Sequence, residues 1–308
     1  MPQAVVYSEY GDSSVLSLAD LPMPEPGPGT VRVRVEYASV NPVDAKMRAG
    51  VLSDGSPLAS PTIPGMDIAG TVDAIGEHVI GFEVGDRVAG LAPNGAAAEY
   101  VVTYTMTLVK VPDHVPSAIA ATIGVGGSTA VRALGTADVM EGQLLLVDGA
   151  AGGVGTFLTQ LARSRGARVV GTASPRNHEH LAAFGVTPID YSGDWEQAAI
   201  DAAGGRPFDA AFDLVTGGKY DAFRRLTAPE APIVTLLDPE VPARGGILVT
   251  GTEPGYEHAL QEVMDAIAAG QLEVPIAEVF PLSEIAAAQD LSAAGHVRGK
   301  LLLEIAPQ

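Results

Sequence analysis

A turn crowded with glycine follows an apolar run in the middle of the chain. Residues 144–155 read LLLVDGAAGGVG, and the residues from Val154 to Ser164 are typical of a helix. Glycines at such a helix start leave backbone N–H groups uncovered, and uncovered amides bind the pyrophosphate of a dinucleotide. The spacing is not a literal G-x-G-x-x-G, so the prediction depends on the strand before the turn and the helix after it. The predicted phosphate-binding positions are Gly149, Ala150, Gly152, Gly153, Val154 and Gly155.

The residues that follow the second predicted strand, 167–173, indicate which dinucleotide fits. Sites that prefer NAD usually carry Asp or Glu about 20 residues past the first glycine, where it bonds the ribose 2′-hydroxyl. Here the first carboxylate is Glu179, inside the next predicted helix, whereas Ser174 offers a hydroxyl and Arg176 a guanidinium suited to a phosphate. This pattern favours NADP(H), and the alternative for Arg176 is a solvated loop cation. Tyr191, at the end of the neighbouring strand, is expected beside the adenine ribose.

The first 110 or so residues are predicted to form short strands. Apolar and polar residues alternate over 31–40, 68–76 and 85–92, and the pattern continues over 97–112. The proline-rich run 21–29 is predicted to be a connection, because proline cannot donate to a sheet ladder. Short strands with frequent turn signals favour a compact barrel or sandwich.

From Ser117 to Ala137 the residues are small and compatible with helix, and after them strands alternate with helices. Six strands are predicted, at 144–148, 167–173, 187–191, 208–215, 231–237 and 246–251. Helices are expected between the first four of them, at 154–164, 177–184 and 195–203. Such alternation predicts a parallel sheet with helices on both faces. A helix at 256–269 follows, and strand character returns at 299–306.

Composition excludes several classes of protein. The chain has 37 acidic residues against 18 Lys and Arg, a net charge of −19, which repels nucleic acid and anionic membranes. It has no cysteine, so it forms no disulfide and offers no thiolate to zinc. No apolar run reaches the roughly 18 residues needed to span a bilayer, and no signal peptide is visible. We expect a soluble, cytoplasmic protein that acts on a small molecule.

Several segments, taken together and in this order, resemble the zinc-independent medium-chain dehydrogenase/reductases, the quinone oxidoreductase-like group. They are SVNPVDAKMRAG (39–50), PTIPGMDIAGTVDAIGEHV (61–79), GFEVGDRVAG (81–90), AAAEYVV (96–102), GAAGGVG (149–155) and GHVRGKLLLEI (295–305). The resemblance implies an α/β fold with a GroES-like, β-rich catalytic domain and a Rossmann domain built on a doubly wound parallel sheet. The catalytic domain would comprise 1–118 and 254–308, and the NADPH-binding domain 119–253. It also implies that NADPH binds in a cleft between the two domains, and commonly a homodimer.

The resemblance also assigns residues to the cofactor site. Arg176 and Tyr191 match positions that contact the 2′-phosphate in NADPH-dependent relatives, and Thr129 matches a threonine near the nicotinamide. The further cofactor positions are Val215, Leu236 and Gly251. Zinc alcohol dehydrogenases carry Gly-His-Glu where this chain has Gly65, Met66 and Asp67, so no metal site is expected. Asp67 is predicted to be a buried structural acid.

The substrate side is predicted from the same resemblance. Asn41 matches an asparagine that lines the substrate side of the cleft, and the other predicted pocket residues are Arg48, Leu52, Val125 and Gly126. Two adjacent glycines, Gly126 and Gly127, replace the bulkier residues of relatives, which is expected to widen the pocket or loosen the helix start. Asp44, Lys46 and Arg48 also form a charge run, for which the simplest interpretation is a solvated face, with Arg48 and Leu52 at the pocket mouth as the alternative.

Hydride transfer to a quinone or enone fits a site without zinc. The substrate carbonyl would take up the negative charge, stabilised by donors from Asn41, Thr129 or Lys46. For Asn41 a turn-forming role is the alternative, because Pro42 follows it. Two other functions stay open: a biosynthetic tailoring reductase or cyclase that acts on a polyketide-like substrate, and a non-catalytic NADPH-binding protein.

Overall fold

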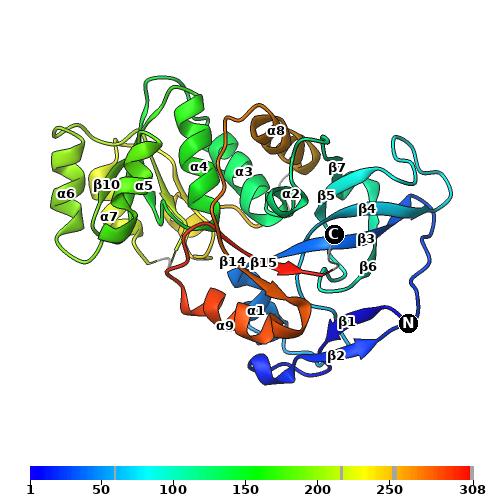
Figure 1. Cartoon of the computed structure of the whole chain (residues 1–308). Coiled ribbons are helices and arrows are strands. Elements are labelled where there is room, and N and C mark those ends of the chain that lie inside the picture. Colours follow the sequence, from blue (N-terminus) through cyan, green and yellow to red (C-terminus); the bar gives the residue numbers. More distant parts are fainter. Residues whose placement is uncertain (59, 216–217, 252–254, 306–308) are drawn as a thin grey trace. The chain divides into compact units, whose positions relative to one another are not determined.

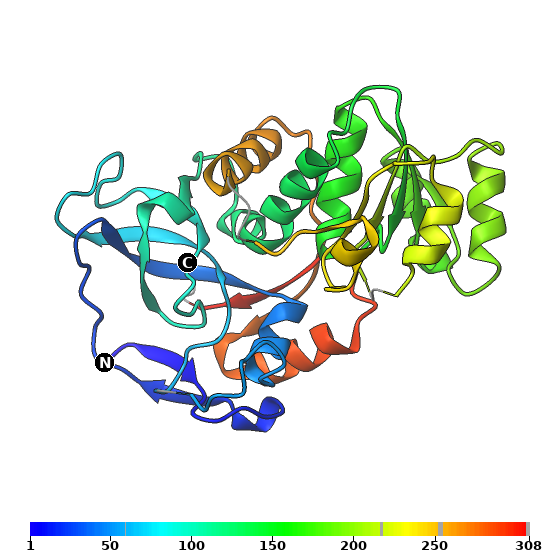
Figure 2. The same ribbon diagram turned by 180° about the vertical axis from the view of Figure 1, so that it is seen from behind.

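The computed structural model describes residues 1–58, 60–215, 218–251 and 255–305. The chain divides into two compact units, which Figures 1 and 2 show from opposite sides. Unit 1 comprises Met1–Gly126 and Leu260–Gln308, and unit 2 comprises Gly127–Ala259. The predicted domain limits were drawn for catalytic and cofactor-binding roles and stay a prediction. The predicted domain boundary between residues 253 and 254 lies outside the described part of the chain. The last residue of the strand predicted at 299–306 also lies outside it.

Unit 1 is built on a sheet in which seven strands are described. Its order is β14-β15-β3-β4-β5-β7, with β6 also paired to β3. The strands are β3 (Thr30–Val40), β4 (Asp67–Ile75), β5 (Arg87–Leu91), β6 (Tyr100–Tyr104), β7 (Leu108–Lys110), β14 (Ile276–Pro281) and β15 (Lys300–Glu304). A separate hairpin joins β1 (Gln3–Val6) to β2 (Ser17–Asp20). In β3 the alternate residues Val31, Val33 and Val35 are fully buried, as the period-two pattern predicts.

The end of the chain completes this sheet. β15 pairs antiparallel with β3, and Leu301 lies opposite Val40. The strand predicted near the C-terminus is therefore confirmed, and its partner comes from the first forty residues. Helices of unit 1 are α1 (Pro42–Arg48), α2 (Ser117–Ala120) and α9 (Ile285–Ala294). α1 and α9 lie side by side in both views (Figures 1 and 2).

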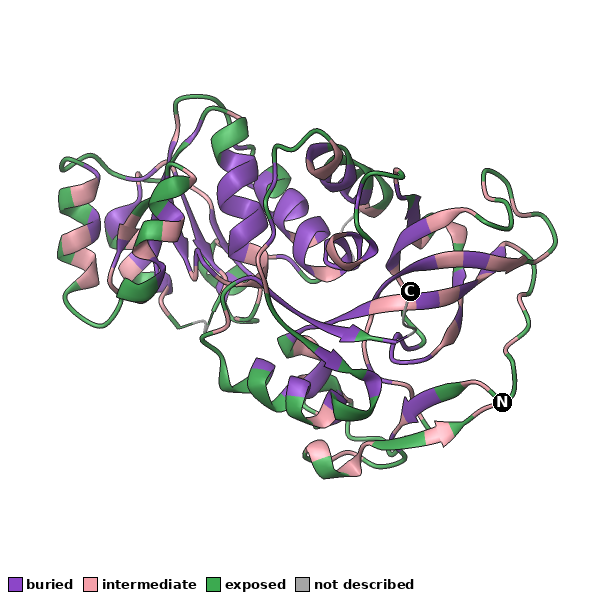
Figure 3. Ribbon diagram, in the orientation of Figure 1, coloured by how far each residue is buried: buried purple, intermediate pink, exposed green. Residues whose placement is uncertain are grey.

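Unit 2 has a six-stranded, fully parallel sheet of order β10-β9-β8-β11-β12-β13. Its strands are β8 (Leu144–Asp148), β9 (Arg168–Thr172), β10 (Thr187–Ile189), β11 (Ala210–Asp213), β12 (Ile233–Thr235) and β13 (Ile247–Leu248). Its helices are α3 (Ser128–Thr136), α4 (Gly153–Ser164), α5 (His178–Ala183), α6 (Trp195–Ala202) and α7 (Tyr220–Leu226), and α8 (Tyr256–Ala268) crosses the division between the units. Figure 3 shows buried residues over the strands and over α3 and α4. The predicted parallel α/β architecture is confirmed.

Several short elements were not predicted. They are α1, α7, α9, β1, β2 and β14, and β6 and β7 were predicted as one segment although a 3-10 turn, Thr105–Thr107, separates them. α1 and α7 have seven residues each, which is too short for a clear helical period. In α9 the run AAA gives little contrast between its faces, so sequence periodicity does not identify it.

Candidate cofactor and active site

The glycine turn joins β8 to α4 and leaves the start of the helix open. Gly149 has a φ of 80°, which glycine adopts without strain. A Cβ on Gly155 would lie 2.2 Å from the carbonyl oxygen of Gly149, so only glycine fits where the helix passes the turn. The first α4 hydrogen bond runs from Thr156 N–H to the carbonyl oxygen of Gly152. The preceding helical amides are not used inside the helix, and they form the geometry of a phosphate cradle.

Apart from Thr129, the other predicted cofactor residues of unit 2 follow the strands at one sheet edge. Because all six strands are parallel, residues after their carboxyl ends meet along this edge. The chain runs from β8 outward to β9 and β10, then returns to β11 on the other side of β8. The switch point of the sheet therefore lies beside the glycine turn, where dinucleotides bind in such folds. The positions that follow strand ends here are Ser174, Arg176, Tyr191, Val215, Leu236 and Gly251.

Side chains at this edge differ in how open they are. Arg176 is exposed and Tyr191 is 40% exposed, whereas the Ser174 hydroxyl accepts a hydrogen bond of 3.2 Å from Asn177 Nδ2. Val215 packs over the turn, because a Cβ on Gly149 would lie 2.2 Å from its Cγ2 atom. The edge thus presents a cation and polar side chains after β9, and the first carboxylate, Glu179, lies in α5.

Unit 1 contains a buried polar cluster made by Asn41, Asp67 and Lys300, which we call the closed cluster. Asn41, Asp67 and Lys300 are 4%, 0% and 3% exposed, respectively. Lys300 Nζ donates to Asn41 Oδ1 at 2.5 Å and lies 3.5 Å from Asp67 Oδ2. Asn41 Nδ2 donates to Asp67 Oδ2 at 3.0 Å. Both ends of the Asn41 carboxamide therefore have charged partners, and its predicted contact with a substrate carbonyl stays a prediction.

Lys300 was not predicted as a site residue. It lies in the quoted segment GHVRGKLLLEI, directly before an apolar strand. A single lysine at a strand start normally reaches solvent, because a buried ammonium is costly unless it is paired. Its partners come from β4 and from the residue after β3, more than 200 positions earlier. No local sequence signal could have identified this contact.

Asp67 also fixes the turn that precedes α3. Val125 N–H donates to Asp67 Oδ1 at 2.6 Å, within a single π-helical turn, Ile123–Gly127. A Cβ on Gly124 would lie 2.3 Å from the same oxygen, so glycine is needed there. The prediction that Asp67 is a buried structural acid is confirmed. Gly126, in the same turn, is buried.

The charge run on α1 is not the solvated face that the sequence suggested. Asp44 and Arg48 are only 3% and 5% exposed, because they lie on the side of the short helix that faces the protein. Among the described residues, Asp44 Oδ1 and the Nε and Nη1 atoms of Arg48 are buried without a hydrogen-bond partner. Lys46 is half-buried, and Leu52 is 60% exposed.

Asp44 lies close to the closed cluster and titrates abnormally. Burial raises its pKa to about 7, against the lowering effect of the Asn41 N–H, which donates to Asp44 Oδ2 at 2.7 Å. The charge of Asp67 raises the pKa further and that of Lys300 lowers it. Burial is the largest of these effects, so the surroundings favour the protonated, neutral form of Asp44.

Thr129 lies in α3 of unit 2. Its side-chain oxygen accepts a hydrogen bond of 3.2 Å from Arg132 Nη2, and the residue is half-buried. The contact ties the predicted nicotinamide-side threonine to the next turn of its own helix. Its role toward the cofactor stays a prediction.

The donor set does not suit zinc. The whole chain lacks cysteine, and the described residues include no group of three or more His, Asp or Glu placed to hold a metal ion. At the position where zinc enzymes carry a histidine, Met66 offers only a weak thioether acceptor.

None of the described helices has the length and apolar character required to cross a membrane.

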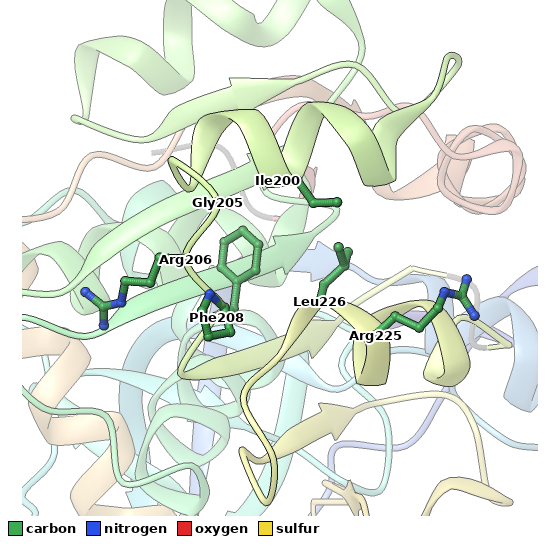
Figure 4. A pocket seen from close by; sticks show the side chains of 7 residues that line it. Ile200, Gly205, Arg206, Phe208, Arg225 and Leu226 are labelled. Carbon is green, nitrogen blue, oxygen red and sulfur yellow. The ribbon is translucent and has the colours of Figure 1, made fainter.

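A shallow pocket of about 230 Å³ lies elsewhere in unit 2 (Figure 4). Pro207 and Phe208 line it just before β11 begins, so it lies at the amino end of that strand, away from the glycine turn. Its guanidinium groups point away from one another in Figure 4 and pair with acids, Arg206 with Asp209 and Arg225 with Glu196. None of the predicted site residues lines this pocket.

Comparison with known proteins places these features in a family. The alcohol dehydrogenase GroES-like domain matches residues 27–113, and the zinc-binding dehydrogenase domain matches residues 185–303. A probable quinone oxidoreductase of Schizosaccharomyces pombe is 32% identical over 325 residues, covering 97% of this chain and 96% of that protein. The chain therefore belongs to the medium-chain dehydrogenase/reductases.

Within that superfamily the chain belongs to the quinone oxidoreductase-like family. The quinone oxidoreductase of Coxiella burnetii has a similar structure, with a TM-score of 0.88, 31% identity and 99% coverage of both chains. A mycobacterial protein solved in complex with NADPH has a TM-score of 0.86 and 28% identity, and the match covers 99% of this chain and 100% of that one. The predicted family and fold class are confirmed.

Proposed function

We propose that the protein is an NADPH-dependent reductase that works without zinc and transfers hydride to a quinone or an α,β-unsaturated carbonyl. The observation that carries the proposal is the sheet edge beside the glycine turn, where Ser174 and Arg176 follow β9 in place of a carboxylate. Relatives that are named quinone oxidoreductases support the reaction class, and the mycobacterial relative with NADPH supports the cofactor.

The residues present fit the cofactor. The amides at the start of α4 would bind the pyrophosphate, and no acidic side chain in the first turn of that helix opposes it. Ser174 and Arg176 would bind the 2′-phosphate, with Tyr191 beside the adenine ribose. Val215, Leu236 and Gly251 follow neighbouring strands and complete the proposed edge. When bound, the nicotinamide supplies a hydride.

The proposed work of the protein toward the substrate is orientation and charge stabilisation. The carbonyl oxygen of an enone or quinone gains negative charge as the hydride arrives, so donors aimed at it lower the barrier. We propose Asn41, Thr129 and Lys46 for this role, with Lys300 and Asp67 holding the Asn41 carboxamide in one orientation. A homodimer in the cytoplasm is the proposed form of the protein.

A cofactor titration followed by a turnover assay tests the function. We expect NADPH to bind at least about tenfold more tightly than NADH, a difference of about 1.4 kcal/mol. Oxidation of NADPH should then depend on an added quinone or enone, measured over a panel of both. A tenfold preference for NADH would contradict the interpretation of Ser174 and Arg176. Tight NADPH binding without turnover on the whole panel would favour a non-catalytic protein.

A further inference from the structure

Two acidic residues lie side by side where the proposed phosphate cradle begins. Asp148 ends β8 and Asp213 ends β11, and the parallel register places them opposite each other. Each is 2% exposed. Asp148 directly precedes Gly149, the first residue of the glycine turn. Carboxylates at this point oppose an anionic ligand unless their charge is compensated.

Asp148 is compensated by a network that also holds the turn. Its Oδ1 atom accepts a hydrogen bond of 2.5 Å from the Thr172 hydroxyl, which in turn accepts one of 3.0 Å from Gly149 N–H. Its Oδ2 atom accepts a hydrogen bond of 2.7 Å from Lys219 Nζ. The ammonium therefore neutralises the carboxylate that orients the first amide of the turn, and we call Asp148 and Lys219 the open pair.

Lys219 is accessible to a ligand at the sheet edge, whereas Asp148 is buried. Its side chain is 30% exposed, against 3% for that of Asp148. It directly precedes α7, and its ammonium lies 5.5 Å from the centroid of the Trp195 ring. An ammonium has three N–H donors, and the hydrogen bond to Asp148 uses one of them. The lysine thus offsets the charge of Asp148 at the carboxyl edge while its side chain stays partly in contact with solvent.

We propose that Lys219 is a positioning residue that sets the preference for NADPH over NADH by neutralising Asp148 beside the glycine turn. The inference rests on the proposed function, because it concerns the same dinucleotide. Without Lys219, a buried carboxylate of full charge would stand next to the cradle. Both dinucleotides place a pyrophosphate in the cradle, so the binding of both should weaken. NADPH carries about two more negative charges, on its 2′-phosphate, so repulsion along the same sheet edge should weaken its binding more strongly.

The test compares Lys219→Met, Asp148→Asn and the double variant, with dissociation constants for both dinucleotides. In Lys219→Met we expect the constant for NADPH to rise at least about tenfold and that for NADH about threefold, with the NADPH effect smaller at high salt. The double variant carries neither charge and should bind NADPH within about threefold of wild type. Lys110→Met is the matched control, because Lys110 pairs with Asp86 at 2.8 Å in unit 1; it should leave both constants unchanged.

Each outcome decides the inference. Equal losses for NADPH and NADH, or no loss, in Lys219→Met would overturn it. A double variant that binds NADPH as weakly as Lys219→Met would also overturn it, since Lys219 would then act by touching the cofactor. If Lys219→Met does not fold, NADPH binding by the double variant decides alone. Wild-type protein that binds neither dinucleotide would overturn the proposed function itself, whereas normal NADPH preference in Lys219→Met overturns only this inference.

Discussion

Each unit pairs an aspartate at one end of a strand with a lysine, and the two pairs differ in their contact with water. In unit 1, Asp67 and Lys300 have side chains 0% and 2% exposed and lie 3.5 Å apart, with Asn41 bonded to both. In unit 2, Asp148 and Lys219 lie 2.7 Å apart, and the lysine side chain is 30% exposed. The same two residue types therefore face opposite electrostatic conditions.

The difference in solvent exposure suits the two pairs to different roles, one in the stability of unit 1 and one in ligand binding by unit 2. In the closed cluster every charge has to be balanced inside the protein, because the side chains have almost no contact with solvent and an uncompensated buried ion is costly. In the open pair the lysine keeps contact with solvent, so its charge can act on a ligand at the sheet edge. We propose that the closed cluster fixes the geometry of unit 1, including the orientation of the Asn41 side chain, and that the open pair acts on cofactor preference.

Removal of Lys300 should give the largest effect. Lys300→Met leaves Asp67 buried with no cation and takes a partner from Asn41, so we expect the free energy of unfolding to fall by about 3–5 kcal/mol. Denaturant unfolding, followed by circular dichroism, measures this. Lys110→Met removes an exposed partner of Asp86 and should cost less than about 1 kcal/mol. Equal losses of unfolding free energy in Lys300→Met and Lys110→Met would show that burial of the closed cluster does not make its charges more important for stability.

Asp44, which lies beside the closed cluster, should make the free energy of unfolding depend on pH. An unfolded aspartate loses its proton near pH 3.8, whereas folded Asp44, with a pKa of about 7, keeps it. Between these values only the folded state holds this proton, so the free energy of unfolding should fall as pH rises, by at most about 1.4 kcal/mol per pH unit. Above pH 7 Asp44 is ionised in both states, so the folded protein bears the full cost of burying its charge.

The variant Asp44→Asn isolates this effect. Its amide oxygen can still accept the Asn41 N–H, but it does not titrate. Urea unfolding at several values between pH 4 and pH 8 should show the variant gaining stability relative to wild type as pH rises. A constant difference across this window would show that Asp44 does not bind the proton in the folded state.

The smallest expected effect comes from the exposed cation at the open edge. Arg176→Ala removes a charge-assisted contact proposed for the 2′-phosphate, so the dissociation constant for NADPH should rise about tenfold. The constant for NADH, which lacks this phosphate, should stay the same. Titration of both dinucleotides checks the ratio, and an equal loss for NADH would place Arg176 outside the 2′-phosphate site.

Local patterns predicted most of the fold and one side of the candidate site. The alternation in β3 and the order of strands and helices from Leu144 onward depend on neighbours in sequence, and both predictions were confirmed. The glycine turn was also identifiable, since only glycine fits at Gly155. The charge run on α1 misled, because whether Asp44 and Arg48 face water depends on what packs against the helix.

The sequence by itself determined the parallel sheet and the glycine turn, because each depends on residue type and spacing within a short window. It determined the family through several such segments taken in order. Tertiary structure alone decided which charges are paired. Lys300 meets Asn41 across 259 positions and Lys219 meets Asp148 across 71. The physical reason is that the cost of a buried charge depends on the partners that the folded chain brings to it, and these are encoded far away.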